Sequence, residues 1–308
     1  LVHTAPDHGV EDFEVCKKYP DWHLEPSGTV GPDGKYTSAV PGYEGKFALD
    51  MNVEMIKALA ASGALFAKGS LRHQYAHCWR CKNPIIYRAT EQWFSSVDGY
   101  RKKALEAIDQ VQWIPSWGHD RIYNMIRDRG DWCISRQRVW GVPIPIFYCR
   151  EHNHAVITDE TITHLQEIFA KEGSDAWWAH TEKELLPEGF KCPECGCTEF
   201  RKESDIMDVW FDSGCTHQGV LCHDPELAYP ADMYLEGSDQ HRGWFNSSLL
   251  TSVAANGIAP YKAVLTHGFT VDGEGRKMSK SVGNTVAPQE VIDQYGADVM
   301  RLWVSSAD

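Results

Sequence analysis

The sequence predicts an α/β protein in which residues 206–308 form a parallel sheet. Strand-like and helix-like segments alternate over this range, which is typical of parallel strands joined by helices. Residues 1–75 mix short strand-like pieces with Gly/Pro turns and predict an α+β module. Residues 149–205 hold paired cysteines and predict a small metal-binding insertion, so residues 76–148 are left as a connective segment.

In the first half of the chain, apolar residues recur with the period of a helix. This spacing predicts helices over Met51–Ser62, Asp98–Val111 and His119–Arg129. Gly63 is a typical terminator of the first of these. Residues 132–148, WCISRQRVWGVPIPIFY, are expected to form a strand that enters a turn.

Another helix is expected to begin near Thr158 or Asp159. Three residues after these positions stand Thr161 and Ile162. Because neither is Glu or Gln, no capping box marks the first residue of this helix, and its start stays open.

The C-terminal third follows the most regular pattern. The segment ADMYLEGSDQHRGWFNSSLLTSVAANG predicts a short strand, a polar turn and a helix ended by Gly257. YKAVLTHGFTV predicts the next strand, and Pro288 suits the first turn of a further helix. Ligands of a parallel sheet bind beyond the carboxyl ends of its strands. The residues expected there are Glu236, Gly237, Ser238, Asp239 and Gln240.

Composition predicts a globular protein of the cytoplasm. Of 308 residues, 43% are hydrophobic and 24% charged, and no apolar run is long enough to span a membrane. The net charge of −13 argues against a surface that coats nucleic acid without selection. The opening LVHTAPDHGV has no initiator Met, and we expect the chain to be an internal fragment.

Two pairs of candidate ligands predict a zinc site. Cys149 and His152 form one pair, and Cys192 and Cys195 form the other, with the spacing of a closed tetrahedral site. His154 or Cys197 could each replace one ligand. The alternative of unrelated buried thiols is less favoured, because the second pair lies in a Pro/Gly turn and so small a domain needs a metal to hold its fold.

Cys78 and Cys81 form half of a similar site. No second half is evident in the chain, so its partners are expected upstream of Leu1. Two reduced, unligated cysteines remain the alternative.

The segment GRKMSKSVGN, residues 275–284, gathers cations and hydroxyls between glycines. Lys277, Ser279 and Lys280 could fold over phosphate groups, because ammonium groups supply charge and the glycines let the loop move. A solvated charged loop is the usual meaning of such a run.

This segment is one of a set that occurs in a fixed order. The others are DWCISRQRVWGVPIP at 131–145, DVWFDSG at 208–214 and MYLEGSDQHRGWF at 233–245. Together they resemble the class I aminoacyl-tRNA synthetases, from VHTAPDHGVEDF to GADVMRLWV. Within that family the turn EGSDQHRGWF is most similar to the isoleucine-specific enzymes of bacterial type.

The resemblance implies the second half of a Rossmann-like catalytic domain, the end of an editing domain and a zinc-bearing insertion. It implies ATP, Mg²⁺, isoleucine and its tRNA as ligands, zinc as a structural metal, and a monomeric parent without a membrane partner. Lys280 matches the ATP-binding lysine, with Lys277 and Ser279 assisting. Such a loop stabilises developing charge without a covalent catalyst.

Glu236 matches the residue that binds the aminoacyl-adenylate, and Gly237, Asp239, Gln240 and His241 share its turn. A helix-capping carboxylate is the alternative for Glu236.

Trp210 and Trp244 match tryptophans of the isoleucine pocket. Without the resemblance, both tryptophans would be assigned to the core, which is the commoner place for this residue.

An isoleucine pocket cannot firmly exclude valine, which implies hydrolytic editing. Asp12 matches the carboxylate that holds the ammonium group of the misattached amino acid, and His3 lies at a matching pocket position. The family's usual Gly is replaced by Asp7, which puts details of that pocket in doubt.

Two departures are larger. The family's His-x-Gly-His motif and its anticodon-reading region are both missing from this sequence. The chain alone is therefore not expected to activate isoleucine. A valine-specific ligase and a zinc-ribbon nucleic-acid-binding module without catalysis are the alternatives, and the net charge opposes the second.

Overall fold

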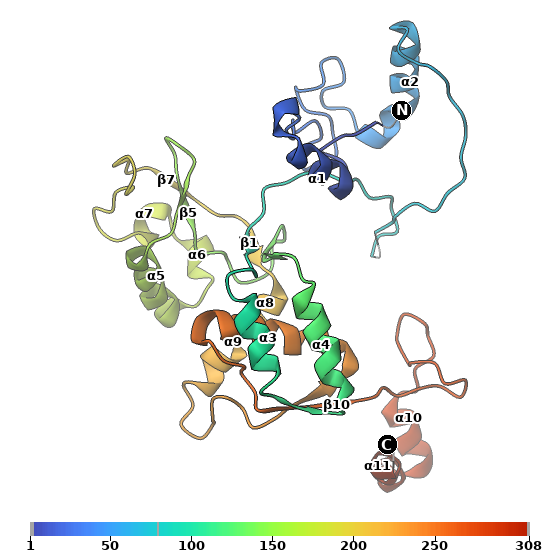
Figure 1. Cartoon of the computed structure of the whole chain (residues 1–308), viewed down its shortest axis with the longest axis vertical. Helices are drawn as coiled ribbons and strands as arrows, with labels where there is room; N and C mark the ends of the chain where they lie inside the picture. Colours follow the sequence, from blue (N-terminus) through green and yellow to red (C-terminus); the bar gives the residue numbers. More distant parts are fainter. Residues whose placement is uncertain (1–2, 79, 307–308) are drawn as a thin grey trace. The chain divides into compact units, whose positions relative to one another are not determined.

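The computed structural model describes residues 3–78 and 80–306. The chain divides into two compact units, the first ending at Glu91 and the second beginning at Gln92 (Figure 1). No described helix is long and apolar enough to cross a membrane.

The first unit consists of short helices and loops. Its helical elements are α1 (Val10–Lys18), η1 (Pro20–Trp22), η2 (Ala48–Met51) and α2 (Asn52–Ala61). α2 confirms the helix predicted over residues 51–62. The predicted strand-like pieces form only isolated bridges in the described part of this unit, such as Val30 with Tyr36. Gly28, Gly34, Gly42 and Gly45 have positive φ and turn the chain, so the expected strands are reduced to isolated bridges in the described part of this unit.

The second unit contains the predicted parallel sheet. Strand β10 (Ala263–His267) lies between β2 (Gln112–Ile114) and β9 (Tyr234–Gly237), and both pairings are parallel. The sequence did not predict β2, because three residues between two helices are too short to show a strand period.

The helical elements around this sheet are α3 (Arg101–Ile108), α4 (Trp117–Arg127), α8 (Val209–Gly214), the π-helical turn η3 (His217–Leu221), the 3₁₀ turn η4 (Ser238–His241) and α9 (Trp244–Asn256). Of these elements, α3, α4 and α9 were predicted, with boundaries that differ by up to three residues, whereas α8 and η3 were not predicted. α3 ends three residues earlier than predicted, because the chain turns into β2. α9 ends at Gly257, whose φ of +76° is easy only for glycine.

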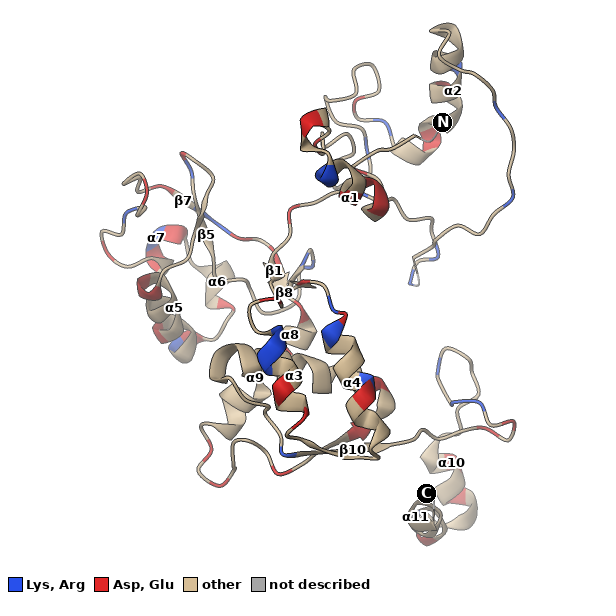
Figure 2. Ribbon diagram, in the orientation of Figure 1, with Lys and Arg blue, Asp and Glu red and all other residues tan. Residues whose placement is uncertain are grey.

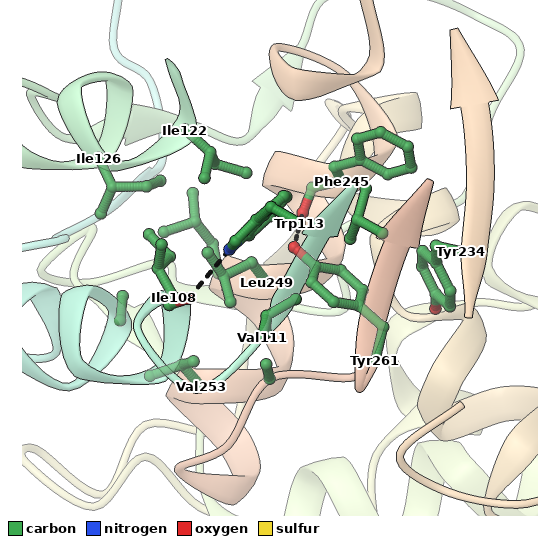
Figure 3. Packing of buried hydrophobic residues seen from close by; sticks show 14 of the residues in the cluster. Ile108, Val111, Trp113, Ile122, Ile126, Tyr234, Phe245, Leu249, Val253 and Tyr261 are labelled. Carbon is green, nitrogen blue, oxygen red and sulfur yellow. Dashed lines mark hydrogen bonds between the residues drawn. The ribbon is translucent and has the colours of Figure 1, made fainter. Parts of the chain in front are cut away.

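The main core lies between the sheet and helices α3, α4 and α9 (Figure 3). Trp113 and Tyr261 fill its centre, and their polar atoms are satisfied. Trp113 Nε1 donates to the Ile108 carbonyl at 3.0 Å, and the Tyr261 hydroxyl donates to the Phe245 carbonyl at 3.0 Å. Every residue of Phe245–Val253 is buried, so α9 is surrounded by protein. This helix gives the neighbouring turn a rigid support.

The predicted strand over 132–148 is wrong as a single element. The structure has β3 (Trp132–Cys133), which pairs with β1 (Phe94–Ser95), then β4 (Ser135–Arg136), which pairs with β8 (Ile206–Met207), and finally β5 (Phe147–Cys149). Between β4 and β5, Gly141 has φ +157°. Pro143 and Pro145 follow it and have no N–H to donate to a ladder.

The insertion has its own antiparallel sheet and core. Its elements are β5, β6 (Ala155–Val156), β7 (Phe200–Lys202), α5 (Asp159–Glu172), α6 (Ala176–Ala179) and α7 (Glu182–Leu185). Phe147, Leu165 and Trp177 are buried at its centre.

The start of α5 is settled by a capping box that the sequence analysis excluded. The Thr161 N–H donates to Thr158 Oγ1 at 3.2 Å, and the Thr158 N–H donates to Thr161 Oγ1 at 3.1 Å. A threonine hydroxyl thus takes the role expected of Glu or Gln.

The chain ends in two helices, α10 (Pro288–Tyr295) and α11 (Ala297–Ser306). Pro288 occupies the first position of α10, as predicted.

Candidate active site

Glu236 lies near the carboxyl end of β9, where the parallel sheet predicts a ligand site. It pairs with Thr266 of β10, and Gly237 pairs with His267. The Glu236 side chain is exposed. We call residues 236–240 the acidic turn.

Gly237 is required by close contacts on two sides. A Cβ at this position would lie 2.9 Å from Asp239 Oδ1 and 2.9 Å from Phe269 Cε1. The backbone has φ −71°, so any restriction at this position comes from the two neighbouring side chains and not from the backbone conformation. The ring of Phe269, which follows β10, therefore rests against the acidic turn.

Trp210, Gln240 and Trp244 come together around Gly243. A Cβ at 243 would lie 2.5 Å from Gln240 Oε1 and 2.8 Å from Trp210 Cη2. Gln240 Oε1 accepts the N–H of Trp244 at 2.9 Å and so caps the start of α9.

The two tryptophans differ in exposure. Trp210 leaves 43% of its surface free. Trp244 stacks on Tyr234 at 4.0 Å, and its Nε1 donates to the Ser213 carbonyl at 3.0 Å. Trp210 therefore offers an accessible ring, while Trp244 fixes α9 against α8.

His241 is fully buried, beside Trp113 and Trp117. Its Nδ1 lies 3.1 Å from the Ser238 carbonyl. Burial lowers the pKa of His241, which favours a neutral ring. Its role as a substrate contact stays a prediction.

Asp208 fixes the start of α8 and with it the position of Trp210. Its carboxylate is 4% exposed and accepts the backbone N–H of Trp210 at 3.2 Å. It also accepts Trp132 Nε1 at 3.0 Å and Arg136 Nη2 at 2.9 Å. On the same helix, burial and then the Asp208 charge raise the pKa of Asp212 to about 6.

The lysine segment forms a hairpin that follows β10 and carries several cations (Figure 2). The Met278 N–H donates to the Thr270 carbonyl at 2.9 Å, and the Asp272 N–H donates to the Arg276 carbonyl at 2.9 Å. We call residues 270–284 the lysine hairpin.

Asp272 and Asn284 clamp the lysine hairpin. Asn284 Nδ2 donates to Asp272 Oδ2 at 2.9 Å, and Asn284 Oδ1 accepts the Ser279 N–H at 3.0 Å. The Asn284 amide and the backbone N–H of Arg276 lower the pKa of Asp272 to about 2. The clamp therefore contains a charged carboxylate at neutral pH.

The structure places the predicted lysines on the surface of this hairpin. Lys280 is exposed, and Lys277 Nζ lies 3.4 Å from the centre of the Phe269 ring. No described contact joins Lys280 directly to Glu236. The lysine hairpin and the acidic turn are instead linked through Lys277, Phe269 and Gly237.

The insertion gathers the predicted metal ligands. The sulfur atoms of Cys149, Cys192 and Cys195 lie within 4.8 Å of one another. His154 Nε2 lies 2.9 Å from Cys192 Sγ, while both His152 and His154 group with Cys149. Three thiols and an imidazole form a donor set that suits Zn²⁺.

The cysteines of this cluster stand in two matching turns. In one, the Cys149 N–H donates to the His154 carbonyl at 3.1 Å. In the other, the Cys192 N–H donates to the Cys197 carbonyl at 2.8 Å. Burial raises the pKa of Cys149, but hydrogen bonds from the N–H groups of His152 and Glu151 and from the side chains of Cys195 and Cys197 lower the pKa overall. This favours the thiolate that binds a metal.

Cys78 begins a third turn of the same kind in the first unit. The Cys78 N–H donates to the Asn83 carbonyl at 2.8 Å, and the Lys82 N–H donates to the Cys78 carbonyl at 2.8 Å. Among the described residues, Cys78 and Cys81 belong to no group of three or more side chains that could hold a metal ion.

The predicted editing residues lie in the first unit. Asp12 Oδ2 accepts the Ala5 N–H at 3.0 Å, which holds α1 beside the segment that carries the exposed His3. Asp7 is buried and accepts the Ser27 N–H at 3.0 Å and the Thr29 hydroxyl at 3.3 Å. The residue that departs from the family pattern thus ties two segments together.

Phe269, Asn284 and Asp208 were not predicted as site residues from the sequence. A position two residues beyond β10 was a signal for Phe269, because ligand sites form at that edge of a parallel sheet. For Asn284 the available signal was a short polar side chain next to a turn, and for Asp208 it was a short polar side chain at a helix start.

Comparisons with known proteins show which family the chain resembles. The isoleucine–tRNA ligase of Moorella thermoacetica is 62% identical over 307 residues, which covers 100% of this chain and 33% of the relative. That of Desulfitobacterium hafniense is 64% identical with the same coverage of 100% and 33%. The chain thus spans about a third of the length of the curated relatives it matches.

A solved methionyl-tRNA synthetase of Mycobacterium tuberculosis with methionyl-adenylate is 19% identical, with a TM-score of 0.44, over 74% of this chain and 35% of that one. This likeness is too slight to bear on function. The family model for tRNA synthetases class I (I, L, M and V), in contrast, matches residues 5–308. Because that match covers nearly the whole sequence, the chain belongs to the class I tRNA synthetases.

Proposed function

We propose that the chain is the central part of an isoleucine–tRNA ligase of the cytoplasm. The complete protein joins isoleucine to ATP as the adenylate and transfers it to its tRNA, with Mg²⁺ accompanying ATP. The observation that carries this proposal is the contact of the lysine hairpin with Phe269, which itself rests on the acidic turn. The link through Phe269 from Lys277 to Gly237, the neighbour of Glu236, supports a site that takes both a polyphosphate and an amino acid.

In this proposal Lys280 and Lys277 neutralise the phosphate charge that develops as pyrophosphate leaves, and Ser279 lines the same loop. Glu236 accepts hydrogen bonds from the adenylate, beside Asp239 and Gln240. Trp210 supplies an accessible apolar ring for the isoleucine side chain.

The first unit contributes to hydrolysis of misattached valine through Asp12 and His3. The insertion binds one structural Zn²⁺ through Cys149, Cys192, Cys195 and either His152 or His154. Cys78 and Cys81 contribute to a second site. Replacement of Cys192 by Ser should remove one equivalent of zinc from the purified protein, measured by atomic absorption, and unchanged zinc content would contradict this assignment.

ATP–pyrophosphate exchange by the complete protein with a panel of amino acids tests the main proposal. Isoleucine should be the preferred substrate, and Glu236→Ala should abolish exchange. Glu226→Ala, which changes an exposed carboxylate elsewhere, is the matched control. A preference for valine would show that the specificity is wrong.

A further inference from the structure

Phe269 contacts both charged parts of the candidate site. The edge of its ring lies against Gly237, since a Cβ there would be 2.9 Å from Cε1. The face of the ring is covered by Lys277, whose Nζ is 3.4 Å from the ring centre. A cation over an aromatic face is attracted by the ring quadrupole. Phe269 therefore holds Lys277 at the border of the acidic turn.

The carboxylates of the lysine hairpin pair with other residues, so Lys277 is available to an anion. Asp272 pairs with Arg276 Nε at 2.9 Å, and Glu274 pairs with Arg276 Nη2 at 3.3 Å. Asn284 occupies a further position on Asp272. No described carboxylate pairs with Lys277, so the neutral ring orients this ammonium group without cancelling its charge.

The contact between Lys277 and Phe269 is exposed to solvent, so a ligand can replace it. Lys277 is exposed and Phe269 is 38% exposed, so an incoming polyphosphate can reach the ammonium group. An exposed cation–π contact is weak compared with a charge-assisted hydrogen bond to phosphate. A ligand can therefore take Lys277 over from the ring.

We propose that Phe269 is a positioning residue for ATP, which holds Lys277 beside the acidic turn before the nucleotide arrives. This proposal rests on the proposed function. Phe269 itself touches no reacting atom, and its effect is exerted through Lys277. Holding the lysine in place reduces the ordering that ATP binding must otherwise impose.

The test uses the complete enzyme in ATP–pyrophosphate exchange. Phe269→Leu removes the aromatic face but keeps an apolar side chain. It should raise KM for ATP about two- to fivefold, the change expected for an exposed cation–π contact, and leave kcat and KM for isoleucine unaltered. Phe269→Tyr should keep the wild-type KM for ATP. Phe66→Leu, at a fully exposed site, is the matched control.

A double-mutant cycle separates this role from a general structural one. In a Lys277→Met background, Phe269→Leu should have no further effect on KM for ATP. A persistent effect in that background, an equal change in KM for isoleucine, or no effect of Phe269→Leu at all would overturn the proposal.

NMR of the enzyme with ¹³C-dimethylated lysines gives a readout that does not require activity. The signal of Lys277, assigned by its loss in Lys277→Arg, should be shifted upfield by the ring and lose that shift in Phe269→Leu. Addition of ATP should also reduce the shift. A signal without an upfield shift overturns the proposal, whereas failure of wild-type exchange with isoleucine overturns only the proposed function.

Discussion

The acidic turn and the lysine hairpin are held in place by different means. The acidic turn continues a strand of the parallel sheet and leads into α9, whose residues Phe245–Val253 are all buried. The lysine hairpin depends on hydrogen bonds centred on Asp272 and Asn284, and both of its predicted catalytic lysines are exposed. The comparison shows that burial fixes one side of the site, while a few polar contacts that cost little to open hold the other.

The largest difference should appear in stability. Leu249 of α9 is fully buried, and Leu249→Ala should lower the free energy of unfolding by about 2–5 kcal/mol, because it leaves a cavity. Val282 of the lysine hairpin is 63% exposed, and Val282→Ala should change it by less than about 0.5 kcal/mol. Urea denaturation followed by circular dichroism measures both. Similar losses for the two variants would remove the contrast.

For activity the order should be reversed, with the larger effect in the lysine hairpin. Lys280→Met removes a charge that we propose acts on the departing phosphates, and it should lower kcat/KM in ATP–pyrophosphate exchange about 100-fold. Its melting temperature should stay that of the unmodified protein, because Lys280 is exposed. Lys102→Met, at a side chain that is 91% exposed on α3, is the control and should leave exchange unchanged. Loss of stability in Lys280→Met would contradict the division of roles.

Helix α8, which packs against α9, carries an electrostatic cost at Asp212. Its pKa rises from 3.8 to about 6 on folding, so ionisation destabilises the folded state as the pH rises through this interval. The full shift equals about 3 kcal/mol, and screening at this partly exposed carboxyl reduces the expected cost to about 1 kcal/mol at pH 7.

Asp212→Asn should therefore stabilise the protein at pH 7 and have almost no effect at about pH 3, where the carboxyl is protonated in both states. Denaturation curves at the two pH values measure this. An equal gain at both would show that charge is not the cause.

The smallest expected effect concerns the clamp of the lysine hairpin. Asn284→Ala removes the acceptor for the Ser279 N–H and should speed hydrogen exchange of that amide about fivefold, the equivalent of about 1 kcal/mol. The Gln112 amide, which donates to the Lys262 carbonyl in the sheet, is an internal reference and should not change. Equal acceleration of the two amides would indicate global rather than local opening.

The sequence allowed the parallel sheet to be predicted because strand and helix periods alternate clearly in the C-terminal third. Gly257 and Pro288 marked the end of α9 and the start of α10 for local reasons, namely a positive φ and a missing N–H. β2 was not predicted because its three residues form a strand through pairing with β10 and show no strand periodicity of their own. The capping box of α5 was missed because Thr161 stands where Glu or Gln is usual.

The candidate site was predictable only in part. The motifs named Trp210, Gln240 and Trp244, and the fold brings these side chains together around Gly243. The link from Lys277 to Gly237 through Phe269 could not be predicted, because it joins residues of a hairpin and a sheet edge that no local period relates. The sequence motifs predict which side chains belong to the site, but the tertiary structure determines which of these side chains are in contact.

The chain enters and leaves the insertion on two strands that pair with each other, since Phe147 of β5 stands opposite Lys202 of β7. Its two ends are therefore neighbours whatever lies between them. A tight two-residue turn in place of residues 150–199 would span the gap without stretching the backbone. Gain, enlargement or exchange of the insertion therefore requires no change in the parallel sheet.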